Sequence, residues 1–69
     1  MHKFCQIGKL LPGCDGAEDI IIDGRLQQGG WADMCEGHHR VMGCGLGVGK
    51  GQKFRIDPES GKKLEKLEG

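Results

Sequence analysis

Apolar residues fall in short runs along this chain, and turn-forming residues separate the runs. The first clear run, III at residues 20–22, is β-branched, which favours a short strand. The Asp23-Gly24 pair that follows is a strong signal for a tight hairpin turn. A second short strand then ends at the Gly29-Gly30 pair. The pattern therefore predicts a β-hairpin in the first half of the chain.

A short helix is predicted after this hairpin, over the segment WADMCEGHHRVMG at residues 31–43. Gly43 stands where a glycine commonly ends a helix. Gly37 lies inside the segment and weakens the helix, although its neighbours tolerate one. A tryptophan at the start of this segment is typical of the main core residue of a small domain. We expect Trp31 to pack with Ile21, Leu26, Met34 and Leu46.

A second hairpin is predicted at the end of the chain. Two strand-like segments, QKFRID and KKLEKLE, flank the sequence PESG, in which Pro58 and Gly61 mark a turn. The alternative for the last segment is a helical turn over KKLEKLEG.

A glycine occupies every second position of GCGLGVGKG, residues 43–51. A phosphate-binding P-loop would need a glycine five residues before Gly49, where this chain has Cys44, and no dinucleotide-binding glycine pattern is present either. The remaining interpretation is a strand-like segment of period two with one bare side. We expect this side to lie against the protein's own hairpin or helix, with a nucleic-acid backbone as the alternative.

The composition limits how much core this chain can build. It has 69 residues, of which fourteen are glycine, one is tryptophan and two are phenylalanine. A single domain over residues 1–69 therefore needs a further source of stability, which its four cysteines and three histidines offer as a metal site or as disulfides. The sequence shows no signal peptide and no membrane span. We therefore expect a cytoplasmic chain, in which reduced thiols favour a metal.

Four residues have the chemistry and the order of a zinc site. Cys35 and His38 have C-x2-H spacing near the start of the predicted helix, so both side chains can point at one ion. Cys5 and Cys14 precede the hairpin, at a wider spacing than the usual zinc knuckle. A ligand pair, a hairpin and a second pair at a helix start follow the order of a treble-clef zinc finger. The four predict one structural Zn²⁺ in a closed site of three thiolates and one imidazole.

The predicted fold is therefore a small zinc-stabilised α+β domain of the treble-clef-like kind. It comprises a β-hairpin, a short helix, a glycine-rich segment and a C-terminal hairpin. Two alternatives for the ligands stay open, since His2 has H-x2-C spacing to Cys5 and Cys44 would complete an all-cysteine site. We expect Cys44 to be a small buried apolar residue, and His39 to lie on the surface or to donate to a ligand.

Residues 23–54 resemble a group of short, mostly uncharacterised zinc-finger proteins of bacteriophages and actinobacteria. The shared pattern is D-G-[RT]…G-x-W-A-x-M-C-x-x-C…G-x-G-L-G-x-G-x-G-Q-x-[YF]. The matching positions are Asp23, Gly24, Gly30, Trp31, Ala32, Met34, Cys35 and the run from Gly43 through Gln52 to Phe54. The chain departs from the group at His38, which replaces a cysteine, and at the wide spacing of Cys5 and Cys14, where the group has a close C-x-x-C knuckle. Cys44 stands where the group has an apolar residue. The resemblance implies a zinc-binding treble-clef-like fold and a phage or mobile-element source in a bacterial host.

Charge is distributed unevenly, although the formal net charge is zero. Residues 15–36 hold six acids and a single cation, Arg25, whereas residues 37–56 hold four cations and no acid. A basic, glycine-rich stretch favours contact with phosphates. We therefore expect nucleic acid as the partner. Its predicted contacts are Arg40, Lys50, Lys53 and Arg55.

The alternative function is a protein-interaction module that docks on a host protein, which the acidic first half suggests. Catalysis is not expected. An HNH-type nuclease site on a treble-clef scaffold needs a general-base histidine, a second metal and an orienting asparagine. This chain has no asparagine, and His38 is assigned to zinc. We also expect no membrane partner and no small-molecule substrate.

Overall fold

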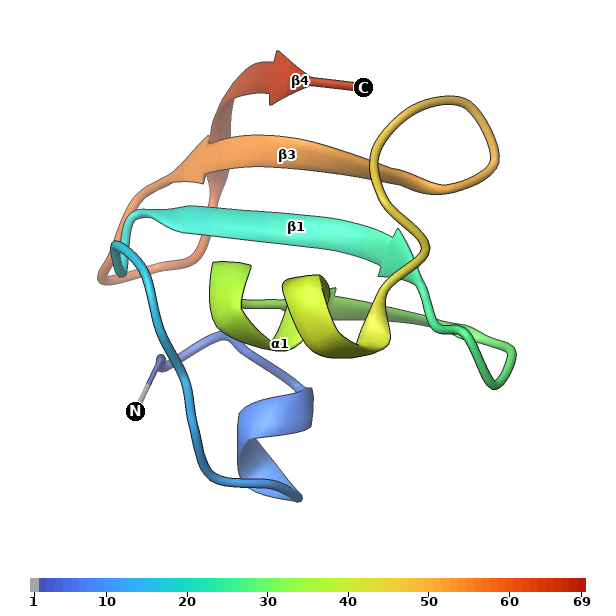
Figure 1. Ribbon diagram of the computed structural model, residues 1–69. Coiled ribbons are helices and arrows are strands. Elements are labelled where there is room, and N and C mark those ends of the chain that lie inside the picture. The colour runs from blue at the N-terminus through green and yellow to red at the C-terminus, as the bar shows by residue number, and fades with distance from the viewer. Residues whose placement is uncertain (1) are drawn as a thin grey trace.

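A four-stranded antiparallel sheet forms the framework of the protein, in the strand order β2-β1-β3-β4. The computed structural model describes residues 2–69. Figure 1 shows the single α-helix against the β1–β2 side of the sheet, with β4 at the far edge. The expected α+β class is thereby confirmed. Within the described residues no helix is long and apolar enough to cross a membrane. The elements are η1 (Ile7–Lys9), β1 (Ile20–Arg25), β2 (Trp31–Met34), α1 (Glu36–Met42), β3 (Gly51–Ile56) and β4 (Lys63–Glu68).

The first hairpin is present, but its turn lies later than predicted. Strand β1 continues through Asp23-Gly24 as far as Arg25. The turn follows, where the N–H of Leu26 donates to the carbonyl of Gly30 at 2.9 Å. Gly24 serves packing instead, because a Cβ there would lie 3.1 Å from Met34 Cε and 3.3 Å from the His39 ring. The Asp23-Gly24 signal was therefore wrong as a turn: this glycine lets the helix approach the sheet.

The predicted helix begins later than expected. Residues 31–34 form strand β2, whose Cα partners in β1 run from Arg25↔Trp31 to Ile22↔Met34. Cys35 is the N-cap of α1, and its sulfur accepts a hydrogen bond from the His38 N–H. Gly43 ends the helix as predicted, with its N–H bonded to the carbonyl of His39. Its conformation is extended, and glycine is needed because a Cβ would clash with the His39 ring.

Trp31 does not form the core, contrary to the prediction. Its side chain is 56% exposed, whereas Met34 in the same strand is fully buried. The alternation of side chains along a strand explains the difference in exposure, because successive side chains point to opposite faces of the sheet. Ala32 and Met34 face α1, so Trp31 faces the other way. The largest fully buried side chains are Ile21, Met34, Ile56, Cys5 and Cys35.

The glycine-rich segment is a loop, so the predicted period-two strand was wrong. Gly45, Gly47 and Gly49 have φ angles of 92°, 124° and 76°, and an added Cβ at any of them would meet nothing within 4 Å. Glycine is therefore needed at these three positions for the backbone conformation itself, because residues with a side chain rarely adopt such positive φ angles. Close approach to the protein's own backbone is confirmed at Gly51. A Cβ there would lie 3.3 Å from the Cα of Gly24, its partner in β1.

The C-terminal hairpin is confirmed. Strands β3 and β4 pair antiparallel, and the Asp57 N–H donates to the carbonyl of Lys62 at 2.9 Å across the turn. The Asp57 carboxylate accepts the N–H of Glu59 at 2.9 Å, and backbone donors of this kind lower its pKa. Every residue of β4 is exposed, and its register shifts twice. Such irregularities discourage pairing of an edge strand with another chain.

Candidate metal centre

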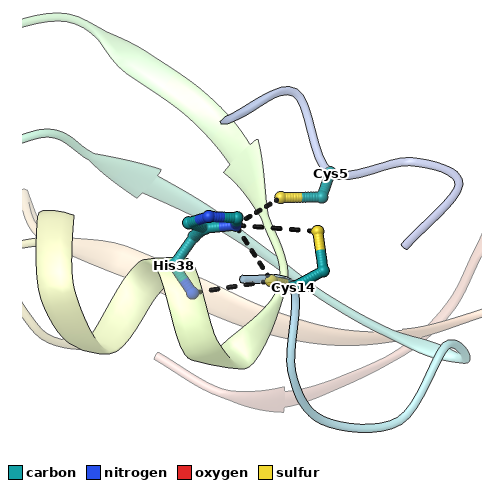
Figure 2. Close-up of side chains that lie close together, drawn as sticks. Cys5, Cys14 and His38 are labelled. Atoms are coloured by element: carbon teal, nitrogen blue, oxygen red, sulfur yellow. Dashed lines mark hydrogen bonds between the residues drawn. The ribbon is translucent and has the colours of Figure 1, made fainter. Parts of the chain in front are cut away.

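Three separate segments bring the four predicted ligands together. Cys5 precedes η1, Cys14 follows it, and Cys35 and His38 lie at the start of α1. One ligand atom from each of the four lies within 4.8 Å of all the others. Figure 2 shows the side chains of Cys5 and Cys14 on one side of the His38 ring, with dashed lines joining both sulfurs to it. The cysteines are free thiols, so a shared metal is the arrangement that this cluster fits.

The distances from the His38 nitrogen to the three sulfurs match those of a tetrahedral zinc site. The Nδ1 atom of His38 lies 3.4 Å from the sulfur of Cys5, 3.7 Å from that of Cys14 and 3.3 Å from that of Cys35. With zinc bonded at about 2.3 Å to sulfur and about 2.0 Å to nitrogen, tetrahedral angles separate these atoms by about 3.5 Å. The three distances lie on both sides of this value, so one ion can reach all four ligands with small adjustments.

The other nitrogen of His38 fixes the orientation of the ring. Its Nε2 lies 3.0 Å from the carbonyl oxygen of Pro12, to which it donates a hydrogen bond. This bond leaves Nδ1 without its proton and directed at the three sulfurs. A backbone carbonyl on the second nitrogen is the usual partner of a metal-binding histidine. The loop between Cys5 and Cys14 therefore supplies both ligands and the contact that orients a third.

Backbone N–H groups surround the sulfurs. The Gly8 N–H donates to the sulfur of Cys5 at 3.3 Å, and the His38 N–H to the sulfur of Cys35 at 3.5 Å. Burial acts to raise the pKa of Cys35, but hydrogen bonds from the backbone of His38 and Asp15 and from the thiols of Cys5 and Cys14 together lower the pKa to about 7. Burial raises the pKa of Cys5. The backbone thus favours the thiolate that a metal requires at the helix start.

Two glycines let the three segments approach one another. A Cβ on Gly8 would lie 2.5 Å from the sulfur of Cys14. A Cβ on Gly37 would lie 2.6 Å from Asp15 Cβ and 3.3 Å from the carbonyl of Gly13. Sequence reasoning missed both roles and treated Gly37 only as a weak point of the helix. The position of Gly8, three residues after the ligand Cys5, was the one feature of the sequence that could have indicated its role in the metal site.

The alternative ligands lie elsewhere. His2 is buried, but its Nε2 bonds to the carbonyl of Ile20 at 2.8 Å and its Nδ1 accepts the N–H of Phe4 at 3.1 Å. Cys44 is exposed, so its expected burial was wrong. His39 is half-buried and bonds to a loop carbonyl. None of the three histidine or cysteine side chains belongs to the cluster.

The four predicted nucleic-acid contacts are not gathered into a free basic stripe. Three of them form ion pairs, and Lys50 has none within residues 2–69. The distances are 3.7 Å for Arg40–Asp15, 3.1 Å for Lys53–Glu36 and 3.2 Å for Arg55–Glu65. The folded chain thus brings acids from other segments, Asp15, Glu36 and Glu65, into contact with three of the four cations.

The fold and the cluster together define a small α+β domain with a Cys₃His group that can hold one metal ion. Zinc is the ion that such a donor set favours. Comparison with protein-family models, with curated proteins and with solved structures finds no match to this chain. The resemblance to phage and actinobacterial zinc-finger proteins therefore stays a prediction.

Proposed function

We propose that this protein is a small binding module whose fold depends on one structural zinc ion held by Cys5, Cys14, Cys35 and His38. The observation that carries the proposal is that the four ligand atoms lie within 4.8 Å of one another, with the distances from His38 Nδ1 to the three sulfurs near those of tetrahedral zinc. Three thiolates and one imidazole fill four positions, and no position remains for a substrate or a reactive water. A closed site of this kind supports a structural role.

The order of the elements supports a treble-clef-like arrangement. The segment around η1 provides two ligands, the β1–β2 hairpin follows, and the first turn of α1 provides the other two. The ion would tie the N-terminal loop to the helix. The strands of the C-terminal hairpin extend the sheet on the side away from this junction.

The energetic reason is the small core. The largest fully buried side chains include only Ile21, Met34 and Ile56 besides the ligands Cys5 and Cys35. Domains of this size rarely obtain more than about 3–5 kcal/mol of stability from an apolar core. Structural zinc sites contribute about 10–16 kcal/mol of binding free energy, which becomes folding free energy when the unfolded chain has no site. Removal of the ion is therefore expected to unfold the domain.

Metal analysis of purified protein tests this proposal. We expect one zinc per chain, a cobalt spectrum with charge-transfer bands of three thiolates, and loss of tertiary structure when a chelator is added. Cys14→Ser should lose the metal, whereas Cys44→Ser, the matched control, should keep it. A metal-free protein with an unchanged thermal midpoint in chelator would refute the proposal.

The same site argues against catalysis, and we propose that the protein is not an enzyme. The Nδ1 atom of His38 faces the sulfurs, and its Nε2 donates to the carbonyl of Pro12. Neither nitrogen is therefore available as a general base. Magnesium-dependent cleavage of DNA by the pure protein would contradict this. Nucleic acid is the partner that the sequence suggests for this binding module, and docking on a host protein is the alternative.

A further inference from the structure

The exposed Trp31 stands beside a cation at one end of the sheet. It is the chain's single tryptophan and is 56% exposed. Its register partner in β1 is Arg25, which is also exposed. Directly opposed residues of an antiparallel pair share one face of the sheet. Since Gly24 and Ala32 face α1, Trp31 and Arg25 lie on the face that the helix leaves free.

A second cation lies next to this pair. The N–H of Arg25 donates to the carbonyl of Lys50 at 2.8 Å, one position beyond the register pair Gly24–Gly51. Lys50 is exposed, and within residues 2–69 neither it nor Arg25 forms an ion pair. Figure 1 shows the β1–β2 turn and the glycine-rich loop at the same end of the sheet.

The remainder of this face has two cations and two acids among residues 2–69. Lys66 is the register partner of Phe54, and Lys63 lies 4.7 Å from the centre of the Phe54 ring. The acids of the face are Asp23 and Asp33, which are register partners of each other. Lys63 pairs with Asp23 at 3.4 Å. With Arg25 and Lys50 added, the face has a positive balance, although the formal net charge of the chain is zero.

We infer that the surface formed by Trp31, Arg25 and Lys50 binds single-stranded nucleic acid, with a base stacked on the indole and phosphates beside the two cations. An aromatic side chain with a neighbouring cation is the usual stacking platform for single strands. A duplex keeps its bases stacked on one another, so it offers no base to an exposed indole. The inference rests on the zinc-dependent fold proposed above. Of the four cations predicted from the sequence, this surface keeps Lys50, and it adds Arg25 and Trp31 on the face of the sheet opposite α1.

Tryptophan fluorescence measures this binding directly, because Trp31 is the only tryptophan. The probes are an oligothymidylate and an oligouridylate of about ten nucleotides, the size that small single-strand modules cover, and a DNA duplex of equal length. Each sample is first shown to hold one zinc and to be folded, so a failure of the fold is recognised separately. We expect the single strands to quench the fluorescence at low salt and the duplex to leave it unchanged.

Variants assign the binding to the three residues, with anisotropy of a labelled oligonucleotide as the measure. Trp31→Ala should weaken binding about tenfold, which is the usual effect of losing one stacked base. Arg25→Ala and Lys50→Ala should each reduce the slope of log affinity against log salt by about 0.7, the value for one phosphate contact on a single strand. Lys62→Ala, at the opposite end of the sheet, makes the same charge change and should leave the slope unaltered.

Three results would overturn the inference. The first is an absence of quenching by both single strands while the protein holds one zinc, which would favour a protein partner. The second is duplex binding as tight as single-strand binding. The third is equal affinity of Trp31→Ala and the unaltered protein.

Discussion

One added methyl group at Gly8 would test whether the four side chains act as a single metal site. Gly8 lies in η1, and its φ angle is not in the positive range that favours glycine. The backbone therefore accepts alanine at this position without strain. The new Cβ would nevertheless lie 2.5 Å from the sulfur of Cys14. The substitution thus perturbs one ligand and spares the local conformation.

The size of the effect follows from this distance. Ordinary van der Waals contact begins at 3.4 Å, so the sulfur of Cys14 or the η1 turn would have to move by about 1 Å. A bound metal tolerates ligand displacements of about 0.2 Å. Overpacking in a tight site costs about 1–3 kcal/mol, and about 1.4 kcal/mol is tenfold in affinity. We therefore expect Gly8→Ala to weaken zinc binding about 10- to 100-fold.

Competition with a chromophoric chelator measures the affinity, and the cobalt spectrum reports the geometry. Lys9→Ala is the matched control, because Lys9 is the next residue of η1 and is exposed. It should bind zinc as the unaltered protein does. If Gly8→Ala bound zinc within twofold of the control and gave the same cobalt spectrum, Cys14 would not be a ligand in the geometry described here.

Three further substitutions or treatments probe the rest of the molecule. Gly37→Ala should lower the thermal midpoint of the zinc-loaded protein, because its Cβ would lie 2.6 Å from Asp15 Cβ; an unchanged midpoint would show that the helix and the loop are not in close contact. His2→Ala should cost about 1–3 kcal/mol in denaturant unfolding, because it leaves the carbonyl of Ile20 without its buried partner, yet the zinc content should stay at one per chain. An alkylating reagent should modify one cysteine, Cys44, in the zinc-loaded protein and all four after chelation; protection of Cys44 by zinc would make it a ligand.

Much of the candidate site was predictable because it depends on side-chain chemistry. Thiolate and imidazole groups are the ligands that zinc prefers, and C-x2-H spacing at a helix start places two of them together. Cys35 and His38 were therefore recognisable as a ligand pair from their own segment of the sequence. The wide spacing of Cys5 and Cys14 gave a weaker signal, since their meeting depends on the path of the loop between them. Whether the group binds metal in solution stays a prediction.

Local turn and cap signals succeeded where no distant segment competed with them. The turn at Pro58 and Gly61 and the helix end at Gly43 are of this kind, because their hydrogen bonds join near neighbours in the chain. The Asp23-Gly24 signal failed because pairing with β2 and β3 supplies backbone hydrogen bonds on both sides of it. There the pairing of three strands outweighed the local preference for a turn.

The exposure of Trp31 and Cys44 and the neutralisation of the cations depended on the tertiary arrangement. Residue type favoured burial for the first two, but strand alternation turned the indole away from α1, and the loop left the thiol exposed. The ion pair of Lys53 with Glu36 joins β3 to the start of α1. Such contacts join residues far apart in sequence, so a pattern read along the chain does not contain them. The chain thus specifies the Cys35–His38 pair locally, whereas its meeting with Cys5 and Cys14 and the face available to a partner follow from the tertiary arrangement.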